Sequence, residues 1–193
     1  MNLSWLMLLP VLLPVAVGLC VLFLPEMQDR KQRTLVTMAM LSANVILLLP
    51  VLFGGEMTQP LFILSDSLPV FLHADSMSKI FAVVMSFVWA MAGLYSFDYM
   101  AHEGGEKRYY GLYLITLGVL MGLCFSGSIV TFYMFYEAMT LLTMPMVMHS
   151  GEKSAVAAGL KYLIYSVIGA SLVLLGVFVL SPYVTSFSFT SGV

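Results

Sequence analysis

The residue with the clearest capacity for chemistry is Glu137, an acid in the middle of a long apolar stretch. Residues 126–149 read SGSIVTFYMFYEAMTLLTMPMVMH, long enough to cross a bilayer as a helix at about 1.5 Å per residue. An acidic side chain at membrane depth costs roughly 3 kcal/mol on insertion scales, so about six leucine-like residues are needed to offset it. Intramembrane acids mostly serve transport, so Glu137 is interpreted as a proton or ion site. A structural hydrogen bond between helices is the alternative.

Two polar neighbours extend this candidate site along one helical face. Tyr133 lies four residues before Glu137 and Thr140 lies three residues after it, so all three share a side of the helix. We expect this stripe to face protein or water rather than lipid. Pro145 has no N–H to bond the carbonyl of Leu141, so the helix is expected to bend near its inner end and admit water.

Lys161 and His149 are the next candidates for a proton pathway. Lys161 is predicted to lie about 8 Å from Glu137 along the membrane normal, which favours a water-bridged relay over a direct ion pair. Its alternative role is a lysine that reaches the inner membrane surface. His149 ends the apolar stretch. It is interpreted either as a proton entry point or as a histidine that bonds the last carbonyls of its helix.

Asp75 and Lys79 are four residues apart at the start of another apolar stretch. They are interpreted as an outer relay or, alternatively, as a helix cap with a surface ion pair. Cys20 and Cys124 are isolated, and no histidines have the spacing of metal ligands. No phosphate-binding loop or nucleophile–base pair is present. The sequence therefore predicts no catalytic residue, no metal and no cofactor bound by this chain.

The elements that must position these residues are membrane helices. The chain has 193 residues, of which 61% are hydrophobic and only 9% charged, whereas soluble domains carry about 25% charged residues. Such a chain cannot cover a surface that faces water. Its net charge of −2 gives no reason to expect nucleic acid as a partner. We therefore predict an all-α integral membrane protein with a single domain over residues 1–193, in contact with the lipid bilayer.

Polar loops, prolines and glycines divide the chain into six predicted membrane spans. They cover residues 3–25, 34–53, 75–97, 109–125, 128–148 and 155–180. The segment 54–74 alternates weakly between apolar and polar residues, and it is expected to be a loop with at most a short strand.

Basic residues predict the orientation of these spans. Six of the eight lysines and arginines fall in the loops on one side or next to them: Arg30, Lys31, Arg33, Lys107, Arg108 and Lys153. The loops on the other side carry no basic residue. Because positively charged loops stay inside, both the N-terminus and the C-terminus are predicted to lie on the outer side.

Four segments resemble a known family. They are HADSMSKIF (73–81), YSFDYM (95–100), FYMFYEAMTLLTMPMV (132–147) and AGLKYLIYSVIGASLVLLG (158–176). Together they resemble the antiporter-like, proton-translocating membrane subunits of respiratory NADH:quinone oxidoreductase, membrane-bound hydrogenases and multi-subunit sodium/proton antiporters. The strongest match is the Glu followed by a Thr-Leu pair, and then Lys-Tyr-Leu in the next span.

The resemblance implies that Glu137 is the essential glutamate of this family and that Lys161 matches a basic residue at the start of the sixth span. Family members couple this glutamate to a lysine on a following broken helix, which lies beyond residue 193. The resemblance covers the N-terminal half of the usual subunit. A complete channel then needs a second polypeptide, unless the chain is a divergent or split module or a fragment.

The resemblance also sets the expected function and surroundings. We expect a membrane-arm subunit of an ion-translocating redox complex, with other membrane and peripheral subunits as partners and iron–sulfur clusters or other redox centres on those partners. A sodium/proton antiporter subunit without redox chemistry is one alternative, and a structural or assembly subunit is another. The expected location is the prokaryotic cytoplasmic (inner) membrane, and the transported ion is either a proton or sodium.

Overall fold

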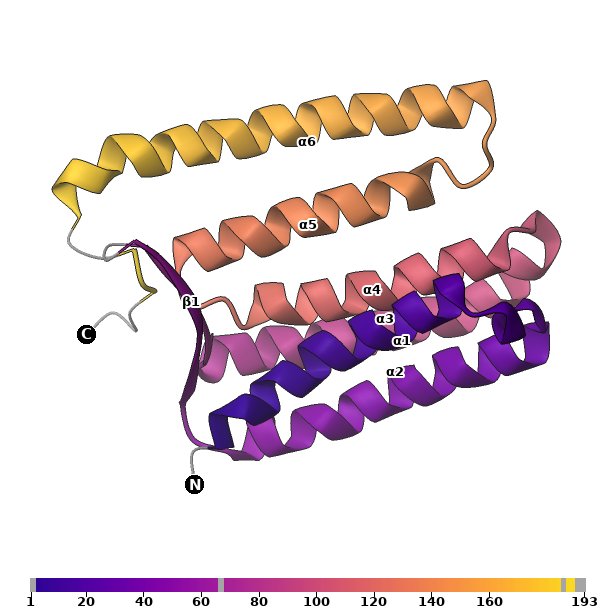
Figure 1. Ribbon diagram of the computed structural model, residues 1–193, viewed down its shortest axis with the longest axis horizontal. Helices are drawn as coiled ribbons and strands as arrows, with labels where there is room; N and C mark the ends of the chain where they lie inside the picture. The colour runs from indigo at the N-terminus through magenta and orange to yellow at the C-terminus, as the bar shows by residue number, and fades with distance from the viewer. Residues whose placement is uncertain (1–2, 66–67, 185–186, 190–193) are drawn as a thin grey trace.

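Six long helices run side by side, and a small β-hairpin closes one end of the bundle (Figure 1). The computed structural model describes residues 3–65, 68–184 and 187–189. The helices are α1 (Leu9–Phe23), α2 (Arg30–Phe53), α3 (Ser76–Glu103), α4 (Glu106–Cys124), α5 (Ile129–Val147) and α6 (Lys153–Leu180). Each contains most of one predicted span. The short 3₁₀ turns η1 (Leu3–Leu8), η2 (Pro25–Gln28) and η3 (Ser181–Tyr183) flank α1 and α6.

Local capping explains where several helices begin and end. The helix α2 begins at Arg30, earlier than predicted, because the Asp29 side chain accepts a hydrogen bond from the backbone N–H of Lys31. The helix α3 continues beyond the predicted residue 97 as far as Glu103. It stops where Gly104 and Gly105 adopt positive φ angles of 75° and 64°, a conformation that other residues avoid.

The prolines do not interrupt the helices that contain them. Pro10 lies in the first turn of α1, where a missing N–H leaves no helical hydrogen bond unmade. The backbone changes there from the 3₁₀ geometry of η1 to an α-helix. Pro14 and Pro145 lie inside α1 and α5, and both helices continue past them. The helix α5 reaches Val147 before it ends.

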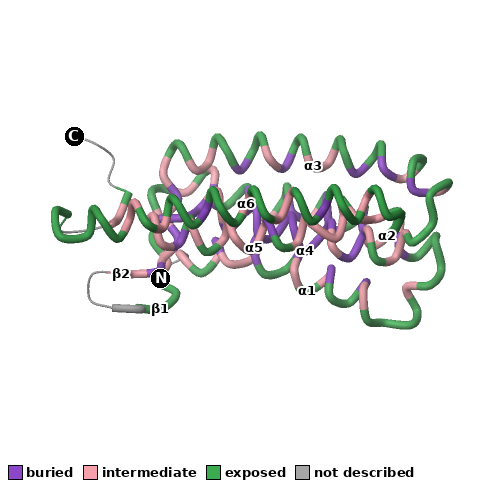
Figure 2. Tube along the Cα trace, turned by 90° about the horizontal axis from the view of Figure 1, so that it is seen from above, coloured by how far each residue is buried: buried purple, intermediate pink, exposed green. Residues whose placement is uncertain are grey.

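The helix α4 is the centre of the bundle. It is buried along almost all of Tyr110–Gly122, which Figure 2 shows as a purple stretch between the outer helices. The helices α1, α2 and α3 pack around it, and α5 packs against its remaining side. The helix α6 packs mainly on α5, and only Gly159 and Ala170 of α6 are buried. The α5–α6 pair therefore leaves a wide face uncovered by the described part of the chain.

Glycines allow α1 and α4 to approach closely. A Cβ atom on Gly18 of α1 would lie 2.6 Å from the carbonyl oxygen of Gly111 in α4. A Cβ on Gly118 of α4 would lie 2.3 Å from the carbonyl oxygen of Val11. These are backbone atoms and cannot rotate away as a side chain would. Small residues at a helix crossing therefore bring the two backbones together, as in other membrane bundles.

Replacing Gly18 by leucine is expected to destabilise the protein, because the new side chain forces α1 away from the backbone of α4. We expect a loss of about 1–3 kcal/mol, the usual cost of overpacking. Thermal unfolding in detergent measures the effect. The matched control is Gly176→Leu, since a Cβ on Gly176 meets nothing within 4 Å. Equal melting temperatures for the two variants would contradict the close packing of α1 on α4.

The predicted loop 54–74 contains two strands rather than at most one short strand, within a chain that is otherwise helical. Strand β1 (Met57–Ser65) pairs antiparallel with β2 (Leu68–Ala74). The hairpin is held by segment 125–127, because the His73 N–H donates to the Phe125 carbonyl at 2.7 Å and the Gly127 N–H donates to the Phe71 carbonyl at 3.0 Å. This partner is more than fifty residues away in the sequence. The alternation alone therefore indicated a strand without indicating what it pairs with.

Four of the helical segments are long and apolar enough to cross a membrane by length and composition. They are Ser4–Phe23, Arg30–Phe53, Ser76–Glu103 and Lys153–Tyr183. The helices α4 and α5 are less apolar, because α4 begins with Glu106-Lys107-Arg108 and α5 carries Glu137 among tyrosines and threonines. The protein is thus a helical membrane protein in which α4, the most buried helix, needs the least contact with lipid.

Candidate ion-translocation site

The helix that carries Glu137 is tied to the hairpin at its first residue. Ser128 caps α5, since its side-chain oxygen accepts a hydrogen bond from the N–H of Thr131 at 3.1 Å. The Ser128 hydroxyl also donates to the Pro69 carbonyl at 2.9 Å. The Phe71 N–H donates to the Thr131 hydroxyl at 3.1 Å. The start of α5 therefore has a defined position against β2, and this sets the direction of the whole helix.

Glu137 is half-buried in the middle of α5. Tyr133, one turn earlier on the same face, is close enough to interact with its carboxylate. The ion pairs in the described residues involve Arg30 and Arg33 with Glu106, and none involves Glu137. Glu137 is therefore an acid with a neutral phenol nearby and, within the described chain, no cation paired with it. Such a group can gain and lose a proton without breaking an ion pair.

Thr140 shares the face of Glu137 but uses its hydroxyl locally. Its side chain is buried and donates to the Tyr136 carbonyl at 3.1 Å. The polar contact between α5 and α6 comes instead from Thr143, whose hydroxyl lies 2.9 Å from that of Tyr162. The sequence analysis missed this pair, because Thr143 lies outside the predicted stripe. The sequence shows only that Thr143 and Tyr162 are polar residues on two consecutive helices, and this is weak evidence that their side chains are in contact.

A groove lies between α5 and α6 on the hairpin side of Glu137. Its volume is about 350 Å³. It is lined mostly by apolar atoms and aromatic rings, together with small residues: Ile129, Phe132, Tyr133, Tyr136, Gly169, Ala170 and Val173. Tyr133 lines the groove and also interacts with Glu137. The same residue is therefore a neighbour of both the acid and this opening between the helices.

Lys161 is not brought to Glu137. It is exposed on α6, whereas Gly159, two residues earlier, is buried against Met148 at the end of α5. Two residues correspond to about 160° around a helix, so Lys161 points away from the α5 side. Within the described residues the predicted relay between Glu137 and Lys161 is not assembled. A role for Lys161 in proton transfer stays a prediction.

His149 joins two turns at the end of the bundle opposite the hairpin. Its Nε2 atom bonds the Gly104 carbonyl at 2.9 Å, and its own carbonyl accepts from Arg108 Nη2 at 2.9 Å. Its ring also packs edge-on against Tyr109. The histidine bonds a carbonyl of the α3–α4 turn rather than the last carbonyls of α5. Its contacts are those of a structural tie, and proton entry through His149 stays a prediction.

Asp75 caps α3, and the predicted ion pair with Lys79 is wrong. The Asp75 carboxylate accepts from the Ser78 N–H at 2.7 Å and from the Ser78 hydroxyl at 2.6 Å. Lys79 Nζ donates instead to the carbonyl oxygens of Gly54 at 2.6 Å and Gly55 at 3.2 Å. Gly54 ends α2, where the partial negative charge of the helix attracts a cation. The lysine is therefore held by the end of another helix.

Asp75→Ala is expected to cost about 1 kcal/mol of stability near neutral pH. Burial raises the pKa of Asp75, but the hydrogen bonds from Ser78 outweigh it and hold the pKa below its ordinary value of 3.8. Stability from the ionised cap is therefore complete above pH 3.8 and is lost as the pH falls through the lowered pKa.

The measurement for Asp75 is thermal unfolding in detergent as a function of pH. The difference between the wild type and Asp75→Ala should shrink on acidification. The exposed Glu103, which has no side-chain partner among the described residues, provides the control as Glu103→Ala. A difference between wild type and Asp75→Ala that is the same at neutral and acidic pH would rule out the ionised cap.

The sequence analysis missed a buried ion pair at the end opposite the hairpin. Arg33 is only 5% exposed. It forms an ion pair with Glu106 of α4 and donates to the carbonyls of Met27 at 3.0 Å and Gln28 at 3.3 Å. Arg30 approaches the same carboxylate at 3.6 Å. The sequence analysis counted these arginines only as charges in a loop. The spacing of Arg33, Thr37 and Asn44 places them on one face of the helix, and the structure shows that this polar face is buried.

A second buried polar contact lies among α2, α3 and α4. Asn44, which is 1% exposed, donates through Nδ2 to the Ser86 hydroxyl oxygen at 3.3 Å. Its Oδ1 atom has no hydrogen-bond partner among the described residues. Neither residue titrates, so sequence reasoning about charge passed over both. Polar contacts between helices specify packing inside a membrane, and this one fixes α2 against α3.

Comparison with known families agrees with this arrangement. Residues 63–110 match a family model described as the N-terminus of chain 5 of NADH-ubiquinone oxidoreductase (complex I). Residues 126–192 match a model described as the transmembrane region of NADH:quinone oxidoreductase and Mrp antiporters. The second match contains α5 and α6 with Glu137 and Lys161. The first contains the end of β1, β2, α3 and the start of α4.

Individual relatives are longer than this chain. A Na(+)/H(+) antiporter subunit of Bacillus subtilis (strain 168) is 22% identical over 171 residues, which are 88% of this chain and 35% of that protein. A chain of the Mrp complex from Dietzia sp. DQ12-45-1b superposes with a TM-score of 0.75 and 16% identity, over 94% of this chain and 20% of that one. A chain of respiratory complex I from Thermus thermophilus superposes with a TM-score of 0.73 and 21% identity, over 94% of this chain and 38% of that one.

These matches share one helical arrangement and extend over most of the described residues. The chain spans about a third of the B. subtilis relative (35%) and a similar share of the T. thermophilus chain (38%). The two family models match successive parts of the sequence, separated by residues 111–125. In these two parts the chain is similar to the antiporter-like membrane subunits of NADH:quinone oxidoreductase and Mrp sodium/proton antiporters.

Proposed function

We propose that this chain is a membrane-arm subunit of an ion-translocating redox complex and contributes part of a proton or sodium pathway through Glu137. The observation that carries the proposal is the state of Glu137. It is half-buried in the middle of α5, it interacts with Tyr133, and no cation pairs with it among the described residues. A purely structural acid would be expected to have a permanent partner.

The mechanism is electrostatic. A carboxylate inside a membrane takes up a proton when no cation is near and releases it when a cation approaches. Protons would pass to and from Glu137 through water and polar side chains, with the Tyr133 hydroxyl as the first of these. Moving one charge against 100 mV needs about 2.3 kcal/mol, and this energy has to come from a partner's redox reaction or an opposing ion gradient.

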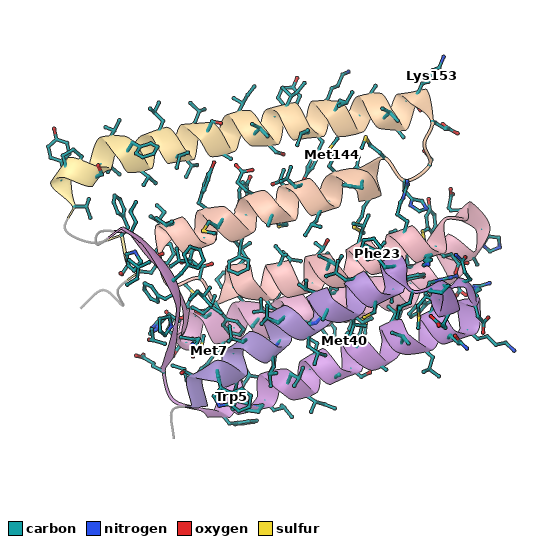
Figure 3. All side chains as sticks on the ribbon, viewed as in Figure 1. Trp5, Met7, Phe23, Met40, Met144 and Lys153 are labelled. Carbon is teal, nitrogen blue, oxygen red and sulfur yellow. The ribbon has the colours of Figure 1, made fainter. Side chains whose placement is uncertain are left out.

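The proposed topology has six membrane spans with both termini on the outer side. Two observations support it. The helix α1 begins and α6 ends at the hairpin end of the bundle (Figure 1). The opposite end carries the turns with Arg30, Lys31, Arg108 and Lys153, the last of which is labelled at the start of α6 (Figure 3). Positively charged turns favour the inner side.

The proposed partners are further membrane and peripheral subunits, together with a chain or segment that supplies the second half of the family's fold. The exposed faces of α5 and α6 support this, because α6 has only two buried residues. Lys161 lies on such an exposed face. Iron–sulfur clusters or other redox centres are proposed for the partner subunits, not for this chain. The proposed location is the prokaryotic cytoplasmic (inner) membrane.

A sodium/proton antiporter subunit without redox chemistry is the second candidate. The names of the similar proteins favour it, since the B. subtilis relative is an antiporter subunit and the Dietzia structure is an Mrp complex. The two candidates share the role of Glu137. They differ in the source of energy, which lies outside this chain in both cases.

Inverted membrane vesicles from the native organism separate the two candidates. Proton uptake is measured after addition of an electron donor, or after a sodium gradient is imposed, in strains with and without this gene. Uptake that depends on the gene and on the electron donor supports the redox complex. Uptake that depends on the gene and on sodium alone supports the antiporter. Vesicles that respond equally with and without the gene would leave the chain a structural or assembly role.

A further inference from the structure

A groove between α2 and α3 lies on a part of the surface that α5 and α6 do not cover. Its wider part, about 700 Å³, opens at the end of the bundle opposite the hairpin. Its walls combine charged residues at the mouth with apolar residues further in, including Arg30, Lys31, Leu35, Met38, Phe97 and Asp98. A narrower part of about 180 Å³ shares Met38 and Ser42 with it and continues to Val45 and Leu94. Because they share these two residues, the two parts follow one another along the helices as one surface groove.

The length of the groove matches one leaflet of a bilayer. The apolar part runs along α2 from Leu35 to Val45, a rise of about 15 Å at 1.5 Å per residue. The hydrocarbon core of a bilayer is about 30 Å thick, so one leaflet contributes about 15 Å. An acyl chain lying in the groove would therefore span its leaflet, with its headgroup at Arg30, Lys31 and Asp98.

The charges at the mouth are only partly used by the protein. Arg30 shares its guanidinium between the Phe97 carbonyl at 3.2 Å and Glu106 at 3.6 Å. Lys31 and Asp98 are exposed, and within the described chain neither the Lys31 ammonium nor the Asp98 carboxylate has a hydrogen-bond or ion-pair partner. One cation and one anion, neither paired within the described residues, therefore face the same opening.

We propose that this groove binds a phospholipid with an amine headgroup, of the phosphatidylethanolamine type. The lipid phosphate would lie against Lys31 and Arg30, and its ammonium would lie against Asp98. Basic sites between membrane helices at the cytoplasmic surface bind lipid headgroups in this way. A phosphatidylglycerol would offer the same phosphate to Lys31 and Arg30 but only hydroxyl groups to Asp98, so the carboxylate would face no cation of the lipid. The carboxylate thus selects the zwitterionic lipid over the anionic one.

Native mass spectrometry of the complex purified from its own membrane tests this proposal. The delipidated complex is exposed to equal amounts of phosphatidylethanolamine and phosphatidylglycerol with the same acyl chains. We expect the wild type to retain the ethanolamine lipid about threefold more than the glycerol lipid, as one exposed ion pair allows. Asp98→Asn should abolish this preference, and Lys31→Gln should lower retention of both lipids. Lys153→Gln, at the same end of the molecule, is the control and should change neither.

A steric variant separates binding in the groove from general attraction to lipid. Met38 lies where the two parts of the groove meet, so Met38→Trp should reduce retention of both lipids without a change of charge. Equal retention of the two lipids by the wild type would overturn the proposal. If Met38→Trp retained as much lipid as the wild type, the proposal would also be overturned. The same holds if a photo-crosslinker placed at Leu94 captured another protein subunit in the intact complex.

Discussion

Glu137→Gln is expected to abolish ion translocation while the complex still assembles. Glutamine has nearly the same shape as glutamic acid, and its amide oxygen can still act as a hydrogen-bond acceptor toward Tyr133. It cannot take up or release a proton. A positioned proton-transfer group contributes a factor of about 100 or more, so the gene-dependent transport rate should fall by about that factor.

The measurement for Glu137 is proton uptake by inverted vesicles, with complex assembly followed on native gels. Glu137→Asp keeps the carboxylate and should retain part of the rate. Glu152→Gln is the matched control, since Glu152 is an exposed acid in the turn before α6. Tyr133→Phe should lower the rate less than Glu137→Gln, because it removes a donor and leaves the acid. A Glu137→Gln complex that pumps at the full rate would leave this chain with a structural role.

Glu106→Gln is expected to produce the largest loss of stability in the protein. It removes the counter-ion of Arg33, whose side chain is 6% exposed. Removal of one partner from a buried ion pair costs about 3–5 kcal/mol, because the remaining charge stays buried. The guanidinium would keep its bonds to the carbonyls of Met27 and Gln28 but would lose its nearest negative charge.

Thermal unfolding in detergent and the amount of folded protein in the membrane measure this loss. Arg30→Gln is the control, since Arg30 approaches the same carboxylate but is 54% exposed, and it should change stability by less than about 1 kcal/mol. The double variant Arg33→Met with Glu106→Met removes both charges and should recover most of the loss. Equal effects of Glu106→Gln and Arg30→Gln would contradict the buried ion pair.

Much of the fold follows from local sequence. Each predicted span corresponds to one helix. The last span, for example, was predicted at residues 155–180 and is the helix α6, Lys153–Leu180. A long apolar stretch has to satisfy its backbone polar groups within itself when it lies in lipid, and a helix does this. The helix boundaries differ from the predicted ones by a few residues where caps act, as at Asp29 and at the glycines 104 and 105.

The arrangement of the candidate site was predictable from the sequence only for residues that are neighbours on the same helix. The place of Glu137 in the middle of its helix and its closeness to Tyr133 depend only on helical geometry, since the two residues are four apart. The direction of Lys161 was not predictable. It depends on which face of α6 packs against α5, and that face is determined by Gly159, Ala170 and Tyr162.

The sequence by itself determined that this chain is a helical membrane protein with an acid in the middle of an apolar helix, because hydropathy and helical spacing are properties of neighbouring residues. Only the tertiary structure decided which charges meet. Lys79 bonds the carbonyl of Gly54 rather than Asp75, and Arg33 pairs with Glu106 across 73 residues. These contacts connect the ends of different helices, and the packing of α2 and α3 around α4 brings them together. No local pattern contains that information.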